Sequence, residues 1–318
     1  MQEIKHRIPM IFPGQGSQTV GMARDLAEGD DAAARFLASA DESLGFGLTD
    51  IMFEGPAETL TETWNAQPAL LAHSVAAGLA LREMGIGPSV VAGHSLGEFS
   101  AAVIAGALEP ADGLRLVRRR GELMFAAGRE VPGTMAAVLG LPGDEVARVC
   151  DEVAAEKGVV VPANYNSEGQ VVISGEVEAV HAAEEPMKAA GARRFAILNV
   201  SGAFHSPLLE GAAARFRAGL EDVAVADAEV PLVANVTAAP VQGAAELKKG
   251  FGDQLTSPVL WQDIMKVIAG DSPRIILEVG AGKVLTGLAR RAFPEVDFVP
   301  VGTREDLAGV LEKIEAAS

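Results

Sequence analysis

Residues 90–108 read VVAGHSLGEFSAAVIAGAL, an apolar run that leads into a glycine-flanked serine and then into a second run of small apolar residues. The first run is short and rich in valine, which is typical of a buried strand, whereas the second has the length of a helix. Between them, Gly93-His94-Ser95-Leu96-Gly97 fits G-x-S-x-G in the strand–turn–helix setting of a nucleophile elbow. The structural alternative is a serine that caps a helix in a glycine-rich turn.

Strand and helix patterns alternate on both sides of this stretch. Helical patterns occupy residues 21–44 and 67–84, the stretch after the elbow to about 108, and about 110–128. Buried strands are expected at RIPMIFPG (7–14), SVVAGHS (89–95), RIILEVG (274–280) and VDFVPVG (296–302). This alternation predicts an α/β domain with a mostly parallel sheet that is covered on both faces.

The segment 134–199 has a different order of predicted strands and helices. Its patterns predict a strand, an amphipathic helix, a hairpin, a second amphipathic helix and a last strand, which is the β-α-β-β-α-β order of a ferredoxin-like unit. The glycines and proline of AAGREVPG (126–133) suggest a linker before it. We therefore expect a small domain at 131–201, inserted into a larger one formed by 1–130 and 202–318.

Composition excludes several classes of protein. The net charge of −17 disfavours nucleic acid and anionic membrane surfaces as partners. A single cysteine, Cys150, rules out an intrachain disulfide, and its helical context predicts a small core residue. The apolar stretch at 69–81 is shorter than the roughly 20 residues of a membrane span, and the N-terminus does not read as a signal peptide. A cytoplasmic protein is expected.

A serine nucleophile needs a base, and the chain offers five histidines. His205 stands among turn residues in NVSGAFHSPLL and is the best candidate by elimination. His94 adjoins the serine, where neighbouring side chains point apart; His73 and His181 lie in helical patterns, and His6 lies in an N-terminus expected to fray. No acidic residue stands out as a third triad member, but a backbone carbonyl can orient an imidazole instead.

Two glycine-rich loops do not match the sequence motifs of nucleotide-binding proteins. In IFPGQGSQTVGM, Thr19 stands where the third glycine of a dinucleotide fingerprint belongs. In LEVGAGKVLTG (277–287), Leu277 and Val284 occupy positions where a P-loop needs glycine and serine or threonine. The first loop could instead present backbone amides to an oxyanion, or it could be only a turn before a helix.

Arg120 lies in the arginine run LRLVRRRGELM, on the helical pattern after the elbow. Turned toward the serine, its guanidinium would bind a carboxylate with two parallel hydrogen bonds, which a simple esterase does not need. Arg118 and Arg119 are expected on the solvated face of the helix.

Six blocks in a fixed order carry a family resemblance that extends from about residue 10 to 290. They are FPGQGSQTVGM, GHSLGEFSAA, RRRGELM, NYNSEGQVVISG, SGAFHSPLL and QLTSPVLW. Together they resemble the malonyl-CoA:acyl carrier protein transacylases. The resemblance implies a hydrolase-like α/β domain with an inserted ferredoxin-like domain, in agreement with the patterns above.

The resemblance also implies roles for particular residues. Ser95 would be acylated, His205 would be the base oriented by a main-chain carbonyl, and Arg120 would bind the malonyl carboxylate. The remaining implied site residues are Gln254 in the substrate site, the amides of Gln15 and Leu96 in an oxyanion hole, and Phe204 against α-branched acyl units.

The implied reaction is a ping-pong transfer of malonyl from malonyl-CoA to the phosphopantetheine thiol of acyl carrier protein, supplying fatty acid biosynthesis without a cofactor or metal. The alternatives are a discrete acyltransferase of a polyketide synthase, a serine thioesterase or other hydrolase, and a non-catalytic docking module. Because carrier proteins are generally acidic, docking on this acidic chain would need a local basic patch. The candidates are Lys188, Arg193, Arg194, Lys283, Arg290 and Arg291, each of which could also be an ordinary solvated charge.

Overall fold

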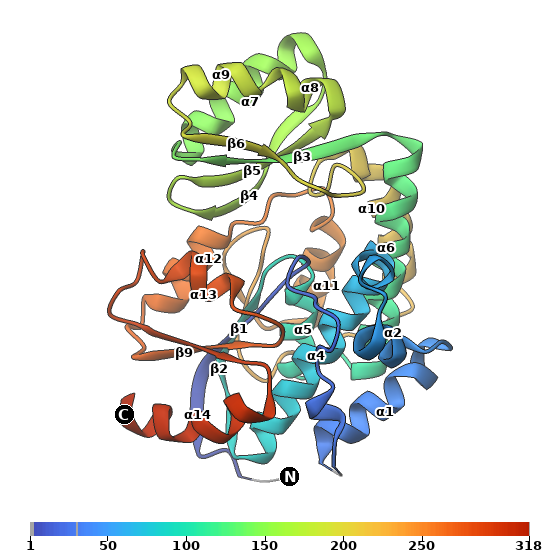
Figure 1. Ribbon diagram of the computed structural model, residues 1–318, viewed down its shortest axis with the longest axis vertical. Helices are drawn as coiled ribbons and strands as arrows, with labels where there is room; N and C mark the ends of the chain where they lie inside the picture. The colour runs from blue at the N-terminus through green and yellow to red at the C-terminus, as the bar shows by residue number, and fades with distance from the viewer. Residues whose placement is uncertain (1–2, 30, 318) are drawn as a thin grey trace.

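A computed structural model describes residues 3–29 and 31–317, which form two β-sheets (Figure 1). The strands of the six-stranded sheet follow the order β10-β9-β1-β2-β7-β8 and pair in parallel, except that β8 is antiparallel to β7. Their bounds are β1 His6–Phe12, β2 Ile86–Gly93, β7 Leu232–Val233, β8 Pro240–Val241, β9 Ile275–Val279 and β10 Asp297–Val301. The predicted mostly parallel sheet is confirmed, and His6 begins β1, one of its two central strands, instead of lying in a frayed terminus.

Helices cover both faces of this sheet, as the alternating patterns predicted. Along β1, Met10 and Phe12 belong to the core under one helical layer, whereas Ile11 belongs to a second core under α12 on the opposite face. The helices of this larger unit are α1 Ala32–Leu44, α2 Leu48–Glu54, α3 Ala57–Thr61, α4 Thr63–Glu83, α5 Gly97–Ile104, α6 Pro110–Glu130, α10 Glu210–Leu220, α11 Ala244–Asp253, α12 Trp261–Ala269, α13 Val284–Ala289 and α14 Arg304–Ala317, with 3-10 turns η1 Asp25–Ala27 and η2 Pro207–Leu209.

The four-stranded sheet is antiparallel, with the strand order β4-β5-β3-β6, and has a core of its own (Figure 1, top). The predicted β-α-β-β-α-β order is confirmed, although the second helix is broken at Ala183 and restarts with Pro186 in its first turn. A proline lacks the amide that a continuous helix would need there. The elements are β3 Gly133–Leu139, α7 Gly143–Lys157, β4 Val160–Ser167, β5 Gln170–Glu176, α8 Val177–Ala182, α9 Glu184–Ala189 and β6 Arg194–Ile197. We propose 131–201 as the limits of this smaller unit.

The prediction of a linker at 126–133 is wrong for most of that range, because α6 continues to Glu130. Gly128 lies inside that helix, and a Cβ atom there would come within 2.0 Å of the Ser201 carbonyl oxygen. The glycine therefore marks the close crossing of α6 by the segment that returns from the smaller unit. Cys150 is buried in the core of that unit, as predicted.

Candidate active site

Ser95 stands at the turn between the end of β2 and the start of α5, with a φ of 52°. Both flanking glycines are required by the tightness of this turn. A Cβ on Gly93 would lie 1.9 Å from the carbonyl carbon of Gly97, and one on Gly97 would lie 2.1 Å from the Phe12 carbonyl oxygen. The hydroxyl-bearing residue is thus held in the left-handed region by neighbours that have no side chains.

His205 is the histidine that the fold brings to this serine. Ser95 Oγ lies 2.7 Å from His205 Nε2, and His205 Nδ1 lies 2.9 Å and 3.1 Å from the carbonyl oxygens of Gln254 and Ser257. Since a carbonyl oxygen can only accept, Nδ1 carries the proton and Nε2 accepts from the serine hydroxyl. Burial, aided by the charge of Arg120, lowers the pKa of His205 to about 3, so the imidazole is neutral at physiological pH.

The other histidines take structural positions. His73 is buried, with Nε2 2.6 Å from the Gly302 carbonyl oxygen, which confirms a core residue. His181 is exposed, and His94 points away from Ser95, with Nε2 2.8 Å from Asn166 Oδ1 on β4 of the smaller unit.

Arg120 is 1% exposed and reaches Ser95 from α6. Its Nη2 donates to Ser95 Oγ at 3.1 Å and to Gln254 Oε1 at 2.8 Å, while Nη1 donates to Gln67 Oε1 at 2.8 Å. No carboxylate within the described residues forms an ion pair with it, and its Nε has no partner there. Burial lowers the pKa of Arg120 to about 10, an effect that the charge of Glu98 opposes. The guanidinium is held by neutral amides and remains available to an anion.

The two neighbouring arginines behave differently from each other. Arg119 is 58% exposed, as predicted. Arg118 is not on a solvated face, because its Nη1 donates to Asn65 Oδ1 at 2.7 Å and its guanidinium lies 4.6 Å from the ring centre of Phe46. Its pairing with these residues, together with the Trp64 carbonyl, directs it away from Ser95.

A cavity of about 380 Å³ opens over the serine and is lined by both units. The smaller unit contributes Met135, Asn164 and the segment 198–200. No hydrogen bond from the backbone amides of Gln15 or Leu96 occurs among the residues that the structure describes. The sequence-predicted residues on the cavity wall are Gln15, Ser95, Leu96, Arg120, Phe204 and His205.

Gln254 does not line the cavity. It is fully buried behind Arg120 and His205, where its side-chain oxygen and backbone carbonyl contact those two residues. Three further buried polar residues lie behind the cavity and were not predicted from the sequence: Gln67, Glu98 and Asn235. The available signal was a polar side chain within an apolar run, which Gln67 and Glu98 both show.

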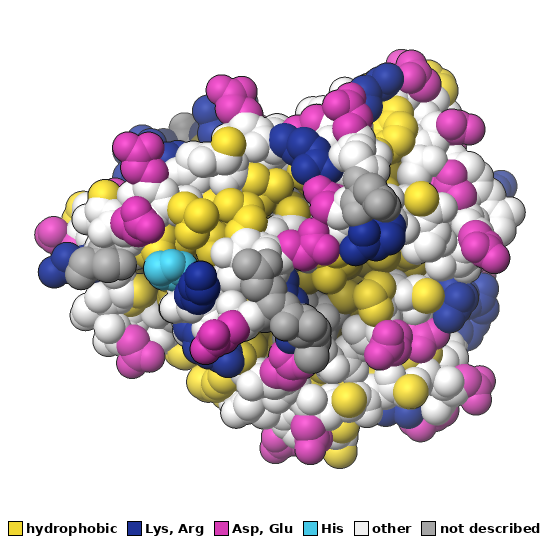
Figure 2. All heavy atoms as spheres, turned by 90° about the horizontal axis from the view of Figure 1, so that it is seen from below, with side chains coloured by type: hydrophobic (Ala, Val, Ile, Leu, Met, Phe, Trp, Pro, Cys, Tyr) yellow, Lys and Arg dark blue, Asp and Glu magenta, His cyan; other side chains and the backbone are white. Residues whose placement is uncertain are grey.

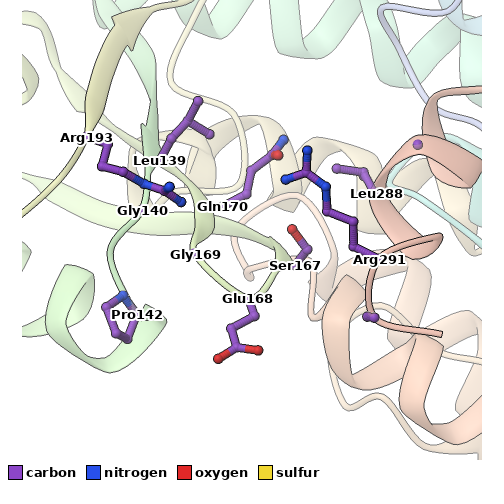
Figure 3. Close-up of a pocket in the computed structure, with 12 residues that line it drawn as sticks. Leu139, Gly140, Pro142, Ser167, Glu168, Gly169, Gln170, Arg193, Leu288 and Arg291 are labelled. Atoms are coloured by element: carbon purple, nitrogen blue, oxygen red, sulfur yellow. The ribbon is translucent and has the colours of Figure 1, made fainter. Parts of the chain in front are cut away.

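A second cavity, of about 660 Å³, lies between the units and is lined by the β4–β5 turn, the end of β3 and α13. Figure 3 shows Arg193 and Arg291 directed into the space between them, with Gln170 nearby and the Glu168 carboxylate turned away. Neither guanidinium has a hydrogen-bond or ion-pair partner within the described part of the chain. By contrast, Lys188 is paired with Glu184 and Glu185.

The face seen in Figure 2 carries acidic and basic side chains interspersed around apolar hollows. Within residues 3–29 and 31–317, no helix is long and apolar enough to cross a membrane. The same residues include no group of three or more His, Cys, Asp or Glu side chains placed to hold a metal ion.

Comparisons with known proteins extend over nearly the whole chain. A family model described as an acyl transferase domain matches residues 10–314. The malonyl CoA-acyl carrier protein transacylase of Bacillus subtilis is 40% identical over 309 residues, which cover 97% of this chain and 98% of that protein. An acyl-carrier-protein S-malonyltransferase structure from Bartonella henselae superposes with a TM-score of 0.92 at 40% identity and covers 97% of this chain and 99% of that one.

A further solved structure is a malonyl-transacylase in complex with its type II polyketide synthase acyl carrier protein. It matches with a TM-score of 0.91 at 40% identity and covers 96% of this chain and 99% of that one.

Proposed function

This chain belongs to the acyl transferase domain family, and from that membership we propose that it transfers malonyl from malonyl-CoA to the phosphopantetheine thiol of acyl carrier protein. The observation that carries the proposal is the geometry around Arg120. The Arg120 guanidinium is buried and has no carboxylate partner, and its Nη2 lies 3.1 Å from the Ser95 hydroxyl. The free end of an acyl group bound to Ser95 would therefore lie beside this cation. A carboxylate at the far end of the acyl group would supply the missing counter-charge.

In the first half-reaction, His205 Nε2 takes the proton of Ser95 as Oγ attacks the thioester carbonyl. The oxyanion of the tetrahedral intermediate accepts hydrogen bonds from the amides of Gln15 and Leu96. When the C–S bond breaks, CoA leaves as a thiol with the proton from His205, and a malonyl ester remains on Ser95. The carbonyl oxygens on Nδ1 keep the imidazole in the required tautomer and stabilise its protonated form.

In the second half-reaction, the carrier thiol gives its proton to His205 and attacks the ester carbonyl. The C–O bond breaks, Ser95 leaves with the proton from His205, and malonyl is bound to the carrier as a thioester. These steps use only side chains and backbone amides, and we therefore propose an enzyme that needs neither cofactor nor metal. We also propose that it works in the cytoplasm. Phe204 would restrict the space beside the acyl group against α-branched units.

A serine hydrolase would use the same serine and histidine but would pass the acyl group to water. Arg120 favours the transferase, because a hydrolase of simple esters gains nothing from a buried cation beside its nucleophile. Whether the carrier serves fatty acid or polyketide synthesis depends on the carrier itself, since relatives named for a transacylase and for a polyketide carrier complex match equally well.

Intact-mass spectrometry tests the proposal in two steps. Incubation with malonyl-CoA alone should add one malonyl group to the protein, and Ser95→Ala should remain unmodified. Addition of phosphopantetheinylated carrier protein should then move that mass to the carrier. Loss of the malonyl group to water at the same rate without carrier would identify a hydrolase, and absence of any adduct would favour a docking module.

A further inference from the structure

Glu98 is a buried carboxylate that the mechanism above does not use. It lies in the first turn of α5, directly after the elbow, and is 1% exposed. Its Oε1 accepts the Asn235 backbone N–H at 2.8 Å, and its Oε2 accepts from Gln254 Nε2. An ionised carboxylate has an acceptor at each oxygen and no donor, so it suits both of these donors, whereas protonation would place an O–H donor on one of the two oxygens.

This carboxylate determines which way the amide of Gln254 points. Gln254 Nε2 donates to Glu98 and to the Ser95 carbonyl oxygen at 3.0 Å, and Oε1 accepts from Arg120 Nη2 at 2.8 Å. If the amide turned over, its oxygen would face two acceptors and its NH₂ would face a guanidinium that can only donate. Glu98 therefore acts together with the Ser95 carbonyl and Arg120 to keep the Gln254 oxygen directed at the guanidinium, and it is the charged member of the three.

The same arrangement gives Arg120 a counter-charge that does not touch it. A carboxylate in direct contact would occupy the two parallel donors that a substrate carboxylate needs. Here Glu98 acts through the neutral amide of Gln254, so the guanidinium is held in place without losing its capacity for an anion.

Glu98 also reaches the elbow through Asn235. The side chain of Asn235 accepts the Ser95 backbone N–H at 2.8 Å and donates to the Gly93 carbonyl oxygen at 2.7 Å. These two bonds join both sides of the turn that holds Ser95 at a φ of 52°. The carboxylate thus fixes the backbone partner that supports the nucleophile and the amide that orients the cation.

We propose that Glu98 is a positioning residue for malonyl selectivity: it orients the amide of Gln254, and through it the guanidinium of Arg120, toward the acyl group on Ser95. The inference rests on the proposed function, because it assigns a role in selecting the carboxylate of that substrate.

Glu98→Gln is the most direct test. Glutamine has one acceptor oxygen, and the backbone N–H of Asn235 is fixed and takes it. The new NH₂ group then faces the NH₂ of Gln254, donor against donor, and this displaces the amide whose oxygen accepts from Arg120. Acylation kcat/KM with malonyl-CoA should fall by about 10- to 100-fold, as for a misplaced binding group, while acylation by acetyl-CoA stays nearly unchanged.

Glu278→Gln is the matched control. Glu278 is equally buried, and its carboxylate accepts the backbone N–H groups of Leu285 and Thr286 outside the active-site cavity. The control should keep the wild-type ratio of malonylation to acetylation whatever it costs in stability. If Glu98→Gln does not fold, Gln254→Met breaks the connection to Arg120 without touching Asn235, and it should lower the ratio of malonylation to acetylation even if the lost bond to the Ser95 carbonyl slows both reactions.

Equal losses with both thioesters, or an unchanged ratio in Glu98→Gln and Gln254→Met, would overturn the positioning role. A wild-type protein that takes malonyl and acetyl groups equally well would overturn the proposed function instead. The two failures are therefore distinguishable in one set of measurements.

Discussion

At the scale of single residues, Arg120 separates a malonyl transferase from an esterase. Arg120→Ala should lower acylation by malonyl-CoA strongly, because removal of one partner of a buried pair costs about 2–5 kcal/mol. That cost corresponds to roughly 30- to several-thousand-fold in rate. Acylation by acetyl-CoA should change little or improve, and Arg120→Lys should rescue only in part, since lysine lacks the planar fork.

The control for this prediction is Arg118→Ala, which removes an arginine from the same helix that is bound to Asn65 and stacked on Phe46, away from Ser95. It should leave the malonyl-to-acetyl ratio unchanged in a stopped-time mass assay. A proportional loss with both thioesters in Arg120→Ala would show that Arg120 is only structural.

Glu98 and His205, two titrating groups of the active site, predict a pH dependence that differs between substrates. Burial raises the pKa of Glu98 to about 7, whereas it lowers the pKa of His205 to about 3. As pH falls through 7, Glu98 gains a proton and loses an acceptor for Gln254, but His205 stays neutral. We expect kcat/KM for malonylation to fall below about pH 7 while acetylation stays level down to pH 5, and Glu98→Gln to remove the difference. A parallel fall for both thioesters near pH 6.5 would mean that His205 titrates normally.

At the scale of elements, the amphipathic pattern of α6 and α7, the long apolar run of α4 and the short apolar runs of β2, β9 and β10 made these elements predictable. The two-residue strands β7 and β8 were not, since no alternation can appear over two positions. Glu98 and Asn235 were missed as site residues for a related reason. Their contact depends on α5 meeting the end of β7 across 137 positions of sequence, and neither local pattern contains that information.

The end of α6 shows how a glycine misleads a sequence-based prediction and gives a test at this scale. Gly128→Ala should destabilise the fold and slow acylation, because its Cβ would displace the Ser201 carbonyl in the segment that leads to His205. Gly250→Ala is the control: Gly250 lies inside α11 with open space around it and should gain about 0.5–1 kcal/mol from helix propensity. Urea unfolding of both variants measures the difference; a stabilised Gly128→Ala would contradict the close crossing.

At the scale of the whole molecule, the cavity between the units narrows the choice of a docking site. Of the six basic candidates, Arg193 and Arg291 line this cavity together, from opposite units (Figure 3). We propose that acidic side chains of the carrier protein bind there while its arm extends along β4, which passes from Asn164 at the active site to Ser167 at the cleft. The step of three residues from Asn164 to Ser167 spans about 10 Å of extended strand, and this is the length of β4 that the arm would follow.

Charge reversal tests this surface. Arg193→Glu and Arg291→Glu should weaken transfer to carrier protein by about tenfold or more, because like charges then face each other at an interface. Acylation by malonyl-CoA should stay intact, and Lys188→Glu, at a lysine already paired with glutamates, should affect neither step. Equal loss of both half-reactions in the arginine variants would contradict docking at this cleft.

The strand order also has a consequence for synthesis on the ribosome. The four strands of the smaller sheet lie between residues 133 and 197, so that unit can complete its pairing as soon as this length has emerged. Strand β1 is made first but needs β9, which begins only at Ile275, on its second edge. A nascent chain stalled before Ile275 therefore carries a paired smaller sheet beside a β1 edge whose backbone N–H and C=O groups have no strand partner, and unfinished chains associate on such edges.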